Sequence, residues 1–467
     1  MTDPRTKVVG TLGPASSSPE VIRGLIEAGL DVARINFSHG THDAHVRAIG
    51  AVRAEAQVAG RPVAILGDLQ GPRIRIGELR EALEVADGQR LAFAPQVRAR
   101  PGDVPVTYEH LASDVRSGGR ILADDGLLEF EVLDVQGDRV FVRAVHGGAL
   151  KPHKGLNLPG VEVSAPSLTE KDRADLAFAV EQDLDYLALS FVRKAEDVRA
   201  LKALLPKGVL VVAKIEKDSA LERLEQILEV TDAVMVARGD LGVELPFEEV
   251  PLAQKRIIGL ANRYGRPVIT ATQMLESMVE HPRPTRAEAN DVANAVLDGT
   301  DAVMLSAETA TGAHPRLAIE AMRRIVLAAE TLPVARGLGL DRLEPGQAST
   351  EETIASATVT AVRVLGAPAV VVLTKSGFSA RIVAARRPGV PIVVLTDRPR
   401  THRQLALVWG VVPVLVPHAA TYEEMARTAR QVLLERKLAR SGDRVVVTAG
   451  VPFDVPGTTN MLKVEQV

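Results

Sequence analysis

Short apolar runs rich in β-branched residues alternate with segments of helical periodicity between residues 7 and 305. This alternation predicts βα units that form a parallel sheet. Between the first two runs, Ser18 followed by Pro19 predicts a helix start and Gly29 predicts its end. Eight runs have the length and composition of strands, and they are residues 8–12, 31–37, 63–69, 185–191, 209–215, 232–237, 267–271 and 301–305.

Eight strands in this order predict a closed (β/α)8 barrel, the TIM barrel, formed by residues 1–69 and 166–335. Such barrels collect reactive side chains at the carboxyl ends of their strands. An open doubly wound sheet is the structural alternative. It is disfavoured because residues 10–14, after the first run, read Gly-Thr-Leu-Gly-Pro, which is not the glycine-rich dinucleotide fingerprint.

Two segments have a different pattern of apolar and polar residues, one inserted in the barrel pattern and one after it. Between the third and fourth runs, period-two segments such as residues 127–135 and 139–145 are separated by Gly/Asp turns, which predicts an all-β insert over residues 70–165. A polar linker near residues 337–349 precedes the apolar runs 369–373, 391–395 and 444–448. These runs predict a C-terminal α/β domain over residues 350–467.

Composition narrows the functional classes. With 467 residues the chain has room for about three domains. A net charge of −3 argues against nucleic acid or a membrane surface as the main partner, and the absence of cysteine excludes disulfides and thiolate chemistry. The first ten residues lack an apolar leader and the later apolar runs are too short to span a bilayer, so we expect a cytoplasmic protein.

Polar side chains gather at the predicted carboxyl ends of the strands. A single one of these residues is explained equally well by a turn or a helix cap. Because several independent strands contribute, the set favours an active site at one mouth of the barrel. The set consists of Asn36, Ser38, Asp68, Lys214, Glu216, Asp240, Thr272, Ser306 and Glu308.

Lys214 and Glu216 lie two residues apart at the end of an apolar strand and so project to one side. A buried ammonium needs an anionic partner, which is either the neighbouring carboxylate in a structural pair or a bound phosphate. Glu216 and Asp240 end adjacent strands and offer the hard oxygen ligands that Mg²⁺ prefers. Gly239 allows the backbone to approach a ligand. The Arg-Gly-Asp triplet continues a buried strand, which argues against an adhesion signal.

Basic residues follow the second and third strands. Arg34 alternates with Asn36 and Ser38 on one strand, and its guanidinium suits a bidentate phosphate contact unless it faces solvent. Arg73 and Arg75 leave the third strand through Gly-Pro, either as a phosphate-facing pair or as a basic hinge.

These segments resemble the pyruvate kinases, in all three predicted domains and in the expected order. The resemblance implies a (β/α)8 barrel interrupted by a mobile β-barrel lid and followed by an α/β regulatory domain. It also implies Mg²⁺-dependent transfer of the phosphoryl group of phosphoenolpyruvate to ADP, giving pyruvate and ATP. The matching segments are ARINFSHG (33–40), DLQGPRIR (68–75), GLNLPG (155–160), LTEKD (168–172), AKIEK (213–217), VARGDLGVELP (236–246), TATQMLESM (270–278), VMLSAETATG (303–312) and GTTNMLKV (457–464).

The resemblance also implies roles for single residues and a homotetramer. Glu216 and Asp240 would bind Mg²⁺ or Mn²⁺, and Lys214 would stabilise the transferring phosphoryl group. The remaining implied contacts are Arg34 with the phosphoryl group, Gly239, Asp240 and Thr272 with the substrate carboxylate, His39, Arg75 and Lys154 with the nucleotide, and Thr272, Ser306 and Glu308 in a water relay that protonates the enolate.

One position departs from the family pattern. Well-studied relatives bind K⁺ at the positions of Asn36, Ser38, Asp68 and the Leu69 carbonyl, and they carry glutamate where this chain has Arg73. A guanidinium and K⁺ would repel each other there, so we expect an enzyme that works without K⁺.

In the third domain, a turn from strand to helix offers hydroxyl groups, Lys375 and a helix start. These suit the phosphate of an effector, although a simple helix cap explains them equally well. Relatives respond to sugar phosphates or nucleotides. The candidate effector residues are Thr374, Lys375, Ser376 and Ser379.

Two rival functions remain. A Mg²⁺-dependent phosphoenolpyruvate or pyruvate lyase would reuse the metal carboxylates, but it leaves the inserted domain, Arg75 and Lys154 without a purpose. The other rival is a catalytically silent metabolite sensor. The presence of Lys214, Glu216, Asp240 and Thr272 together argues against it, because a sensor does not need catalytic residues.

Overall fold

The computed structural model of the chain describes residues 3–332, 348–419, 421–451 and 459–467. Most of the predicted linker, from 337 to 347, lies outside the described residues. The same holds for the expected barrel boundary at 335 and for the first two residues of the 457–464 motif.

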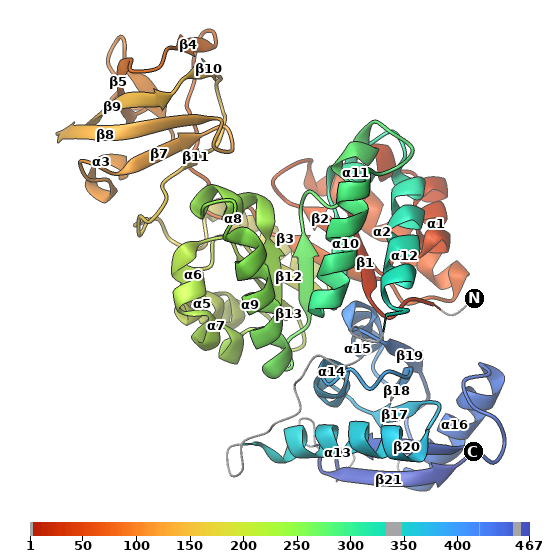
Figure 1. The fold of residues 1–467 in the computed structure, drawn as a ribbon. Helices are drawn as coiled ribbons and strands as arrows, with labels where there is room; N and C mark the ends of the chain where they lie inside the picture. Colours follow the sequence, from red (N-terminus) through yellow and green to blue (C-terminus); the bar gives the residue numbers. More distant parts are fainter. Residues whose placement is uncertain (1–2, 333–347, 420, 452–458) are drawn as a thin grey trace.

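A closed barrel of eight parallel strands forms the centre of the molecule (Figure 1). Its strands follow one another in the order β1-β16-β15-β14-β13-β12-β3-β2, and each of the eight predicted runs supplies one strand. The TIM barrel prediction is therefore confirmed. The strands are β1 (Lys7–Leu12), β2 (Val32–Asn36), β3 (Ala64–Asp68), β12 (Tyr186–Leu189), β13 (Leu210–Ile215), β14 (Ala233–Ala237), β15 (Val268–Ala271) and β16 (Ala302–Leu305).

Helices cover the outside of the barrel. The first begins where the sequence predicts it, because the Ser18 hydroxyl accepts a hydrogen bond from the Val21 N–H, and it ends at Gly29, whose φ is +115°. The helices are α1 (Pro19–Ala28), α2 (His42–Ala59), α4 (Glu170–Glu181), α5 (Ala195–Leu204), α6 (Asp218–Glu222), α7 (Leu224–Val230), α8 (Arg238–Glu244), α9 (Val250–Arg263), α10 (Arg286–Asp298), α11 (Ala307–Ala310) and α12 (Pro315–Ala329).

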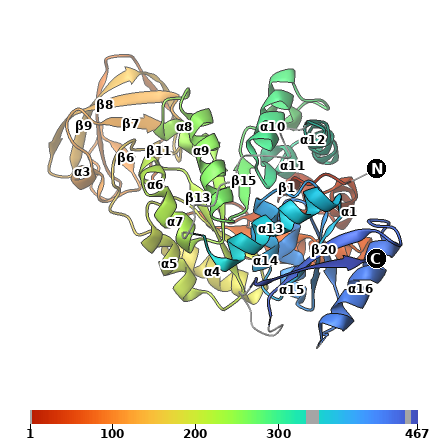
Figure 2. The same cartoon turned by 60° about the horizontal axis from the view of Figure 1, so that its bottom comes forward.

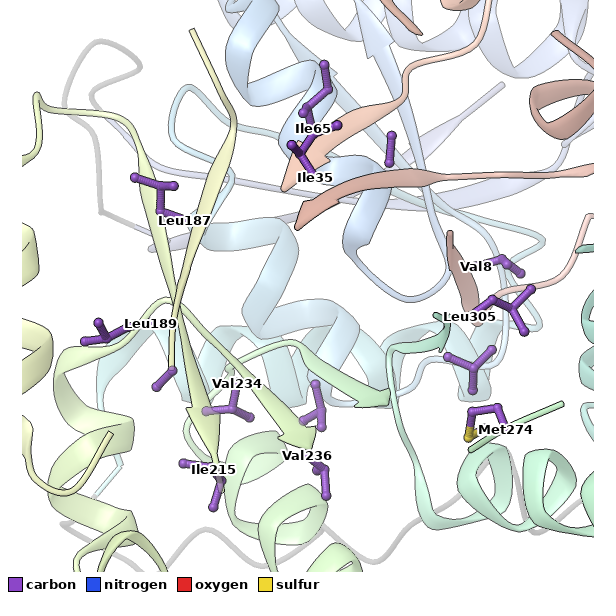
Figure 3. Close-up of a cluster of buried hydrophobic side chains, with 14 of the residues drawn as sticks. Val8, Ile35, Ile65, Leu187, Leu189, Ile215, Val234, Val236, Met274 and Leu305 are labelled. Carbon is purple, nitrogen blue, oxygen red and sulfur yellow. The ribbon is translucent and has the colours of Figure 1, made fainter. Parts of the chain in front are cut away.

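Strand alternation divides the apolar residues into two cores. One core lies between the strands and the surrounding helices and includes Val8, Ile35, Ile65 and Val234 (Figure 3). The other fills the barrel interior. Because side chains of a strand alternate between its faces, a residue two positions after an interior apolar residue also points inward. The interior core contains Val9, Val32, Leu66, Ala188, Val212, Met235 and Met304.

The insert after β3 is a separate β domain, which we call the lid. Its sheet has six strands in the order β11-β7-β8-β9-β5-β6, and β10 pairs with β4 in a second sheet. The predicted strand pair is β8 and β9, joined at Gly137. The sheet is a curled half-barrel whose outer strands, β11 and β6, are only two and three residues long and do not pair with each other. The lid elements are β4 (Leu83–Val85), β5 (Arg90–Pro95), β6 (Val104–Val106), α3 (Leu111–Asp114), β7 (Arg120–Ala123), β8 (Leu128–Gln136), β9 (Arg139–His146), β10 (Gly148–Leu150) and β11 (Leu156–Asn157).

The C-terminal domain is a five-stranded α/β sheet in the order β19-β18-β17-β20-β21, with only β21 antiparallel. Figure 1 shows this domain in blue below the barrel, whereas the lid lies at the upper left; Figure 2 gives the same arrangement from another side. Its elements are α13 (Thr350–Leu365), β17 (Val370–Leu373), α14 (Phe378–Ala385), β18 (Ile392–Thr396), α15 (Pro399–Gln404), β19 (Val411–Leu415), α16 (Tyr422–Glu435), β20 (Arg444–Ala449) and β21 (Met461–Gln466).

The C-terminal domain contacts the base of the barrel, where the strands begin. Ala406 and Leu407 belong to the same apolar cluster as the barrel interior. The guanidinium of Arg387, which is 1% exposed, binds both carboxylate oxygens of Asp301 at 3.0 and 3.2 Å. None of the helices in the described part of the chain is long and apolar enough to cross a membrane.

Candidate active site

A group of buried charges lies at the carboxyl ends of β2, β3 and β13. The Lys214 Nζ atom is 2.8 Å from Glu216 Oε1 and 3.4 Å from Asp68 Oδ1, and it donates to the Ser190 hydroxyl at 2.8 Å. Lys214, Asp68 and Ser190 each follow an interior apolar residue by two positions, which explains why they point into the barrel. The predicted same-side pair of Lys214 and Glu216 is confirmed.

Arg34 joins this group through Asp68. Its Nε and Nη2 atoms each lie 2.7 Å from Asp68 Oδ2, and its Nη1 donates to the Thr11 hydroxyl at 2.9 Å. Arg34 is buried, so the solvent-facing interpretation of this residue is wrong. One carboxylate, Asp68, therefore holds two cations, from β2 and β13, at the same mouth.

The charges in this group determine which protonation states persist. Burial alone would lower the pKa of Lys214, but the carboxylates of Asp68, Glu216 and Asp240 outweigh it and raise this pKa above its usual value. Burial would likewise raise the pKa of Asp68, but Lys214 and Arg34 bring it below its usual value. At neutral pH the ammonium and the Asp68 carboxylate are thus both charged.

Glu216 and Asp240 supply the remaining negative charge. Glu216 is 1% exposed, and its Oε2 accepts a hydrogen bond from the Phe191 N–H at 2.7 Å. Burial, followed by the charge of Asp240, raises the pKa of Glu216 despite the opposing effect of Lys214. The pKa of a carboxyl group is raised in this way when a second carboxylate is close. A bound cation would therefore stabilise the two negative charges.

Asp240 lies on α8, where Gly239 allows a close approach to the loop after β15. The Gly239 N–H donates to the Thr272 hydroxyl at 2.8 Å, and a Cβ atom on Gly239 would stand 3.4 Å from that oxygen. Thr272 and Gln273 have φ angles of +67° and +53°. Non-glycine residues in this region are strained, and such strain is found at functional sites.

Arg238 holds this strained loop. Its guanidinium donates to the carbonyl of Thr272 at 2.6 Å and to that of Ala271 at 3.2 Å, and it pairs with Asp291 of α10 at 2.7 Å. The side chain is 11% exposed. One arginine thus connects α8, the loop after β15 and α10.

Replacing Arg238 by methionine is expected to lower the free energy of unfolding by about 1–3 kcal/mol, because two partly buried carbonyls lose their donor. Urea unfolding followed by circular dichroism measures this difference. Arg199→Met, which removes an exposed pair with Glu196, serves as the control, with an expected change under about 0.5 kcal/mol. Equal stabilities of the two variants would contradict this interpretation of Arg238.

Ser306 and Glu308 follow β16 at the same mouth. Both oxygens of the buried Glu308 carboxylate are bound by backbone N–H groups, from Leu275 at 3.0 Å and from Ser306 at 2.7 Å. Burial raises the pKa of Glu308 despite these bonds. Its observed partners come from the loops after β15 and β16, and Lys214 is not among them.

The three residues expected on the nucleotide side come from the turn after β2 and from the lid. Burial and the charges of Arg73, Arg75 and Arg34 lower the pKa of His39, so these cations lie within electrostatic reach of the imidazole. Arg75 donates to the His153 carbonyl at 3.0 Å, and Lys154 pairs with Asp124 at 2.7 Å within the lid.

A cavity of about 560 Å³ lies between the lid and α8. Its walls include Arg73 and Asp125 from the lid side together with Gly239 and Asp240 from the barrel. Arg73 on the lid side and Asp240 of the barrel mouth therefore face a shared space.

The residues expected at a monovalent-cation site have partners within the chain. Asn36 Oδ1 accepts from the Ser38 N–H at 3.1 Å, and the Leu69 carbonyl accepts from the Ser190 hydroxyl at 2.7 Å. Asp68 Oδ1 is buried without a hydrogen bond and has Lys214 as its nearest cation.

The candidate effector residues lie in the C-terminal domain, apart from the barrel mouth. In the turn from β17 to α14, the Thr374 hydroxyl accepts from the Gly377 N–H at 3.1 Å and the Ser376 hydroxyl accepts from the Phe378 N–H at 3.4 Å. Ser379 shares a hydrogen bond of 2.6 Å with Thr459, and the Lys375 carbonyl accepts from the Thr401 hydroxyl. The turn thus combines a helix start with several hydroxyl groups.

Sequence reasoning missed several residues of the site. Ser190 follows Ala188 by two positions, so strand alternation alone gives its direction. Thr11 bears the same relation to Val9. Arg238 and the ion pair of Lys217 with Glu244 carry no such signal, because their partners are distant in sequence.

Comparison with known families gives a direct match. A model described as pyruvate kinase, barrel domain, matches residues 3–319, and one described as pyruvate kinase, alpha/beta domain, matches residues 352–465. The chain belongs to the pyruvate kinase family.

Individual members of the pyruvate kinase family are similar over nearly the whole chain. The pyruvate kinase of Geobacillus stearothermophilus is 45% identical over 468 residues, which cover 98% of this chain and 80% of that protein. Pyruvate kinase 2 of Synechocystis sp. is 46% identical over 478 residues, covering 99% of this chain and 79% of that protein. The pyruvate kinase of Sporosarcina psychrophila is 42% identical over 468 residues, which cover 98% of this chain and 80% of that protein.

Membership gives the chain pyruvate kinase activity, so it is a phosphotransferase of glycolysis with phosphoenolpyruvate and ADP as the implied substrates. Pyruvate kinases generally use Mg²⁺. The resemblance in the sequence motifs and the expected fold class are both confirmed, and the lyase and the silent sensor are not supported.

Proposed function

We propose that the charged group at the barrel mouth is the catalytic centre for Mg²⁺-dependent transfer of a phosphoryl group from phosphoenolpyruvate to ADP. The bond between phosphorus and the enolate oxygen breaks, and a bond to the terminal phosphate oxygen of ADP forms. The enolate then gains a proton at carbon to give pyruvate. The observation that carries the proposal is the buried Lys214 ammonium, held between Asp68 and Glu216 at the carboxyl ends of the strands.

Glu216 and Asp240 would hold Mg²⁺, or Mn²⁺ in its place. They are two hard oxygen donors on adjacent strand ends, and within the described ranges no group of three or more His, Cys, Asp or Glu side chains could hold a metal by itself. Two protein carboxylates suit Mg²⁺, which keeps waters and takes substrate oxygens for the rest of its shell. When bound, the ion would neutralise charge on phosphate and enolate oxygens.

The side chains of the chain itself position and neutralise the phosphoryl group. Lys214 and Arg34 would contact its oxygens, and Asp68 keeps these two cations at a fixed separation. Positioning and charge neutralisation are the main demands of phosphoryl transfer. The amides of Gly239 and Asp240 and the Thr272 hydroxyl would receive the substrate carboxylate.

The remaining residues would bind the nucleotide and support protonation of the enolate. His39, Arg75 and Lys154 would contact the phosphates of ADP from the side of the lid, which is supported by the charges of Arg73 and Arg75 that act on the His39 imidazole. Protonation of the enolate would pass through a water relay near Thr272, Ser306 and Glu308. Glu308 would act by fixing the two loops through its backbone contacts.

A coupled assay tests the proposal. Lactate dehydrogenase oxidises NADH as pyruvate forms, so absorbance at the NADH band reports turnover with phosphoenolpyruvate, ADP and Mg²⁺. We expect turnover that depends on all three and is abolished by EDTA. Pyruvate release without ATP formation, or no turnover, would contradict the assignment.

We further propose that the enzyme does not require K⁺, because Arg73 supplies a fixed positive charge. In buffer free of K⁺ and Na⁺, the rate should stay within about twofold of that with KCl. Arg73→Glu is the matched variant, and KCl is expected to stimulate it. A many-fold rise of the unmodified enzyme on adding KCl would contradict K⁺ independence.

Three organisational proposals accompany the activity. We place the catalytic barrel at residues 1–69 and 166–335, the lid at 70–165 and the regulatory domain at 350–467, and we place the enzyme in the cytoplasm. A homotetramer is expected and is measurable by analytical ultracentrifugation. The turn containing Thr374, Lys375, Ser376 and Ser379 would bind the phosphate of a sugar phosphate or nucleotide effector, supported by its hydroxyl groups and helix start.

A further inference from the structure

A second buried ion pair lies directly beside the two metal carboxylates, and the mechanism above does not use it. Lys217 Nζ contacts Glu244 Oε1, and the two side chains are 12% and 3% exposed. Lys217 is the residue after Glu216. Glu244 lies on the same helix as Asp240, one turn further on. The pair therefore joins the same two segments that carry the metal ligands.

A residue beside Lys217 also contacts one of the metal carboxylates. Its ammonium is 5.9 Å from the centroid of the Phe191 ring, and the N–H of Phe191 donates to Glu216 Oε2. Phe191 has a φ of +54°, which is a strained conformation for a bulky residue. Lys217, Phe191 and Asp240 line one small cavity of about 40 Å³. A shift of Lys217 would thus reach both carboxylates.

Stability alone gives a weak reason for such a pair. Burying two charges costs desolvation that their attraction often fails to offset, and an apolar pair of similar volume is frequently as stable. A buried pair does, however, fix the separation of the segments that carry it, because either charge is poorly tolerated without the other. Here those segments are the end of β13 and the helix α8.

We propose that the Lys217–Glu244 pair is a positioning device that fixes the separation of the Glu216 and Asp240 carboxylates and thereby sets the affinity for the divalent cation. This inference rests on the proposed function, since it takes these two carboxylates as the metal ligands. Lys217 and Glu244 are positioning residues and need not touch the ion.

A simpler electrostatic explanation predicts different results. If Lys217 and Glu244 acted only through their charges, removing the lysine would strengthen cation binding and removing the carboxylate would weaken it. Positioning predicts that both changes weaken binding. It also predicts weaker binding for Glu244→Asp, which shortens the side chain by one methylene and leaves the charge unchanged.

The test measures binding of Mn²⁺ in the absence of substrates, through the loss of the electron paramagnetic resonance signal of free Mn²⁺. We expect Lys217→Met and Glu244→Gln each to raise the Mn²⁺ dissociation constant about tenfold, the usual effect of losing a partner that orients a ligand. The double variant should be no weaker than the single ones, because both changes remove one interaction. Glu244→Asp is expected to fall between them and the unmodified enzyme.

Lys202→Met is the matched control. Lys202 pairs with Asp232 at 2.8 Å and joins α5 to the residue before β14, at the opposite end of the same strands. It should leave Mn²⁺ binding unchanged. Thermal unfolding of every variant identifies any that is unfolded at the assay temperature, and Glu244→Asp, the mildest change, then decides the question.

The outcomes separate this inference from the proposed metal site. Tighter binding by Lys217→Met, or unchanged binding by Glu244→Asp with all else as expected, overturns the positioning role. Unchanged binding in all pair variants, with loss of binding in Glu216→Gln, also overturns it and leaves the metal site intact. Unchanged binding in Glu216→Gln overturns the metal site itself.

Discussion

Replacing Lys214 by methionine is expected to lower kcat for ATP formation by roughly 10³-fold or more, because a preorganised charge at the reacting phosphoryl group contributes that much to similar reactions. Methionine has a similar length and fills the same space without the ammonium. The coupled assay at saturating phosphoenolpyruvate and ADP measures the loss.

Binding of Mn²⁺ separates lost catalysis from lost structure in this variant. Lys214 lies 2.8 Å from Glu216, so its removal should leave the carboxylates able to bind the cation or strengthen that binding. A folded variant that binds Mn²⁺ and does not turn over is the expected result. Turnover within tenfold of the unmodified enzyme would show that Lys214 is not the stabilising cation.

Asp240→Asn is expected to lower kcat/KM for phosphoenolpyruvate by roughly 10²- to 10³-fold and to raise the Mg²⁺ concentration needed for half-maximal rate. The amide keeps one oxygen but loses the negative charge, which is half of the protein charge offered to the ion. The backbone N–H groups of α8 are unaffected. A titration of rate against Mg²⁺ measures both effects.

Asp218→Asn is the matched control, since it removes an equal charge from an exposed position at the start of α6. Exposed charges contribute little, so its rate and Mg²⁺ dependence should change less than about threefold. If Asp240→Asn shows the same Mg²⁺ dependence as this control, Asp240 is not a metal ligand.

The fold and the centre of the site are readable from strand alternation. An interior residue such as Val212 gives the direction of Lys214 two positions later, and the order of βα units brings the ends of β13 and β14 side by side. These features depend on local periodicity and on the single topology that closes such a barrel. The same rule gives Ser190, which requires only that alternation be followed to the end of β12.

Contacts between side chains from distant segments are not readable in this way. Arg238 and Asp291 are 53 residues apart, and Lys217 and Glu244 are 27 apart, so periodicity gives each residue a direction but not a partner. The backbone bonds that occupy Glu308 depend equally on how two loops meet. The half-barrel form of the lid, in which β6 and β11 stay unpaired with each other, depends equally on how distant strands meet.

Ala406 and Leu407 close the lower opening of the barrel with residues from another domain. A truncated protein that ends before residue 348 would lack these two residues and expose apolar side chains of the barrel interior to water, so it is expected to self-associate. In the intact enzyme the barrel interior and the C-terminal domain therefore share one apolar cluster, at the end of the barrel opposite to the reacting groups.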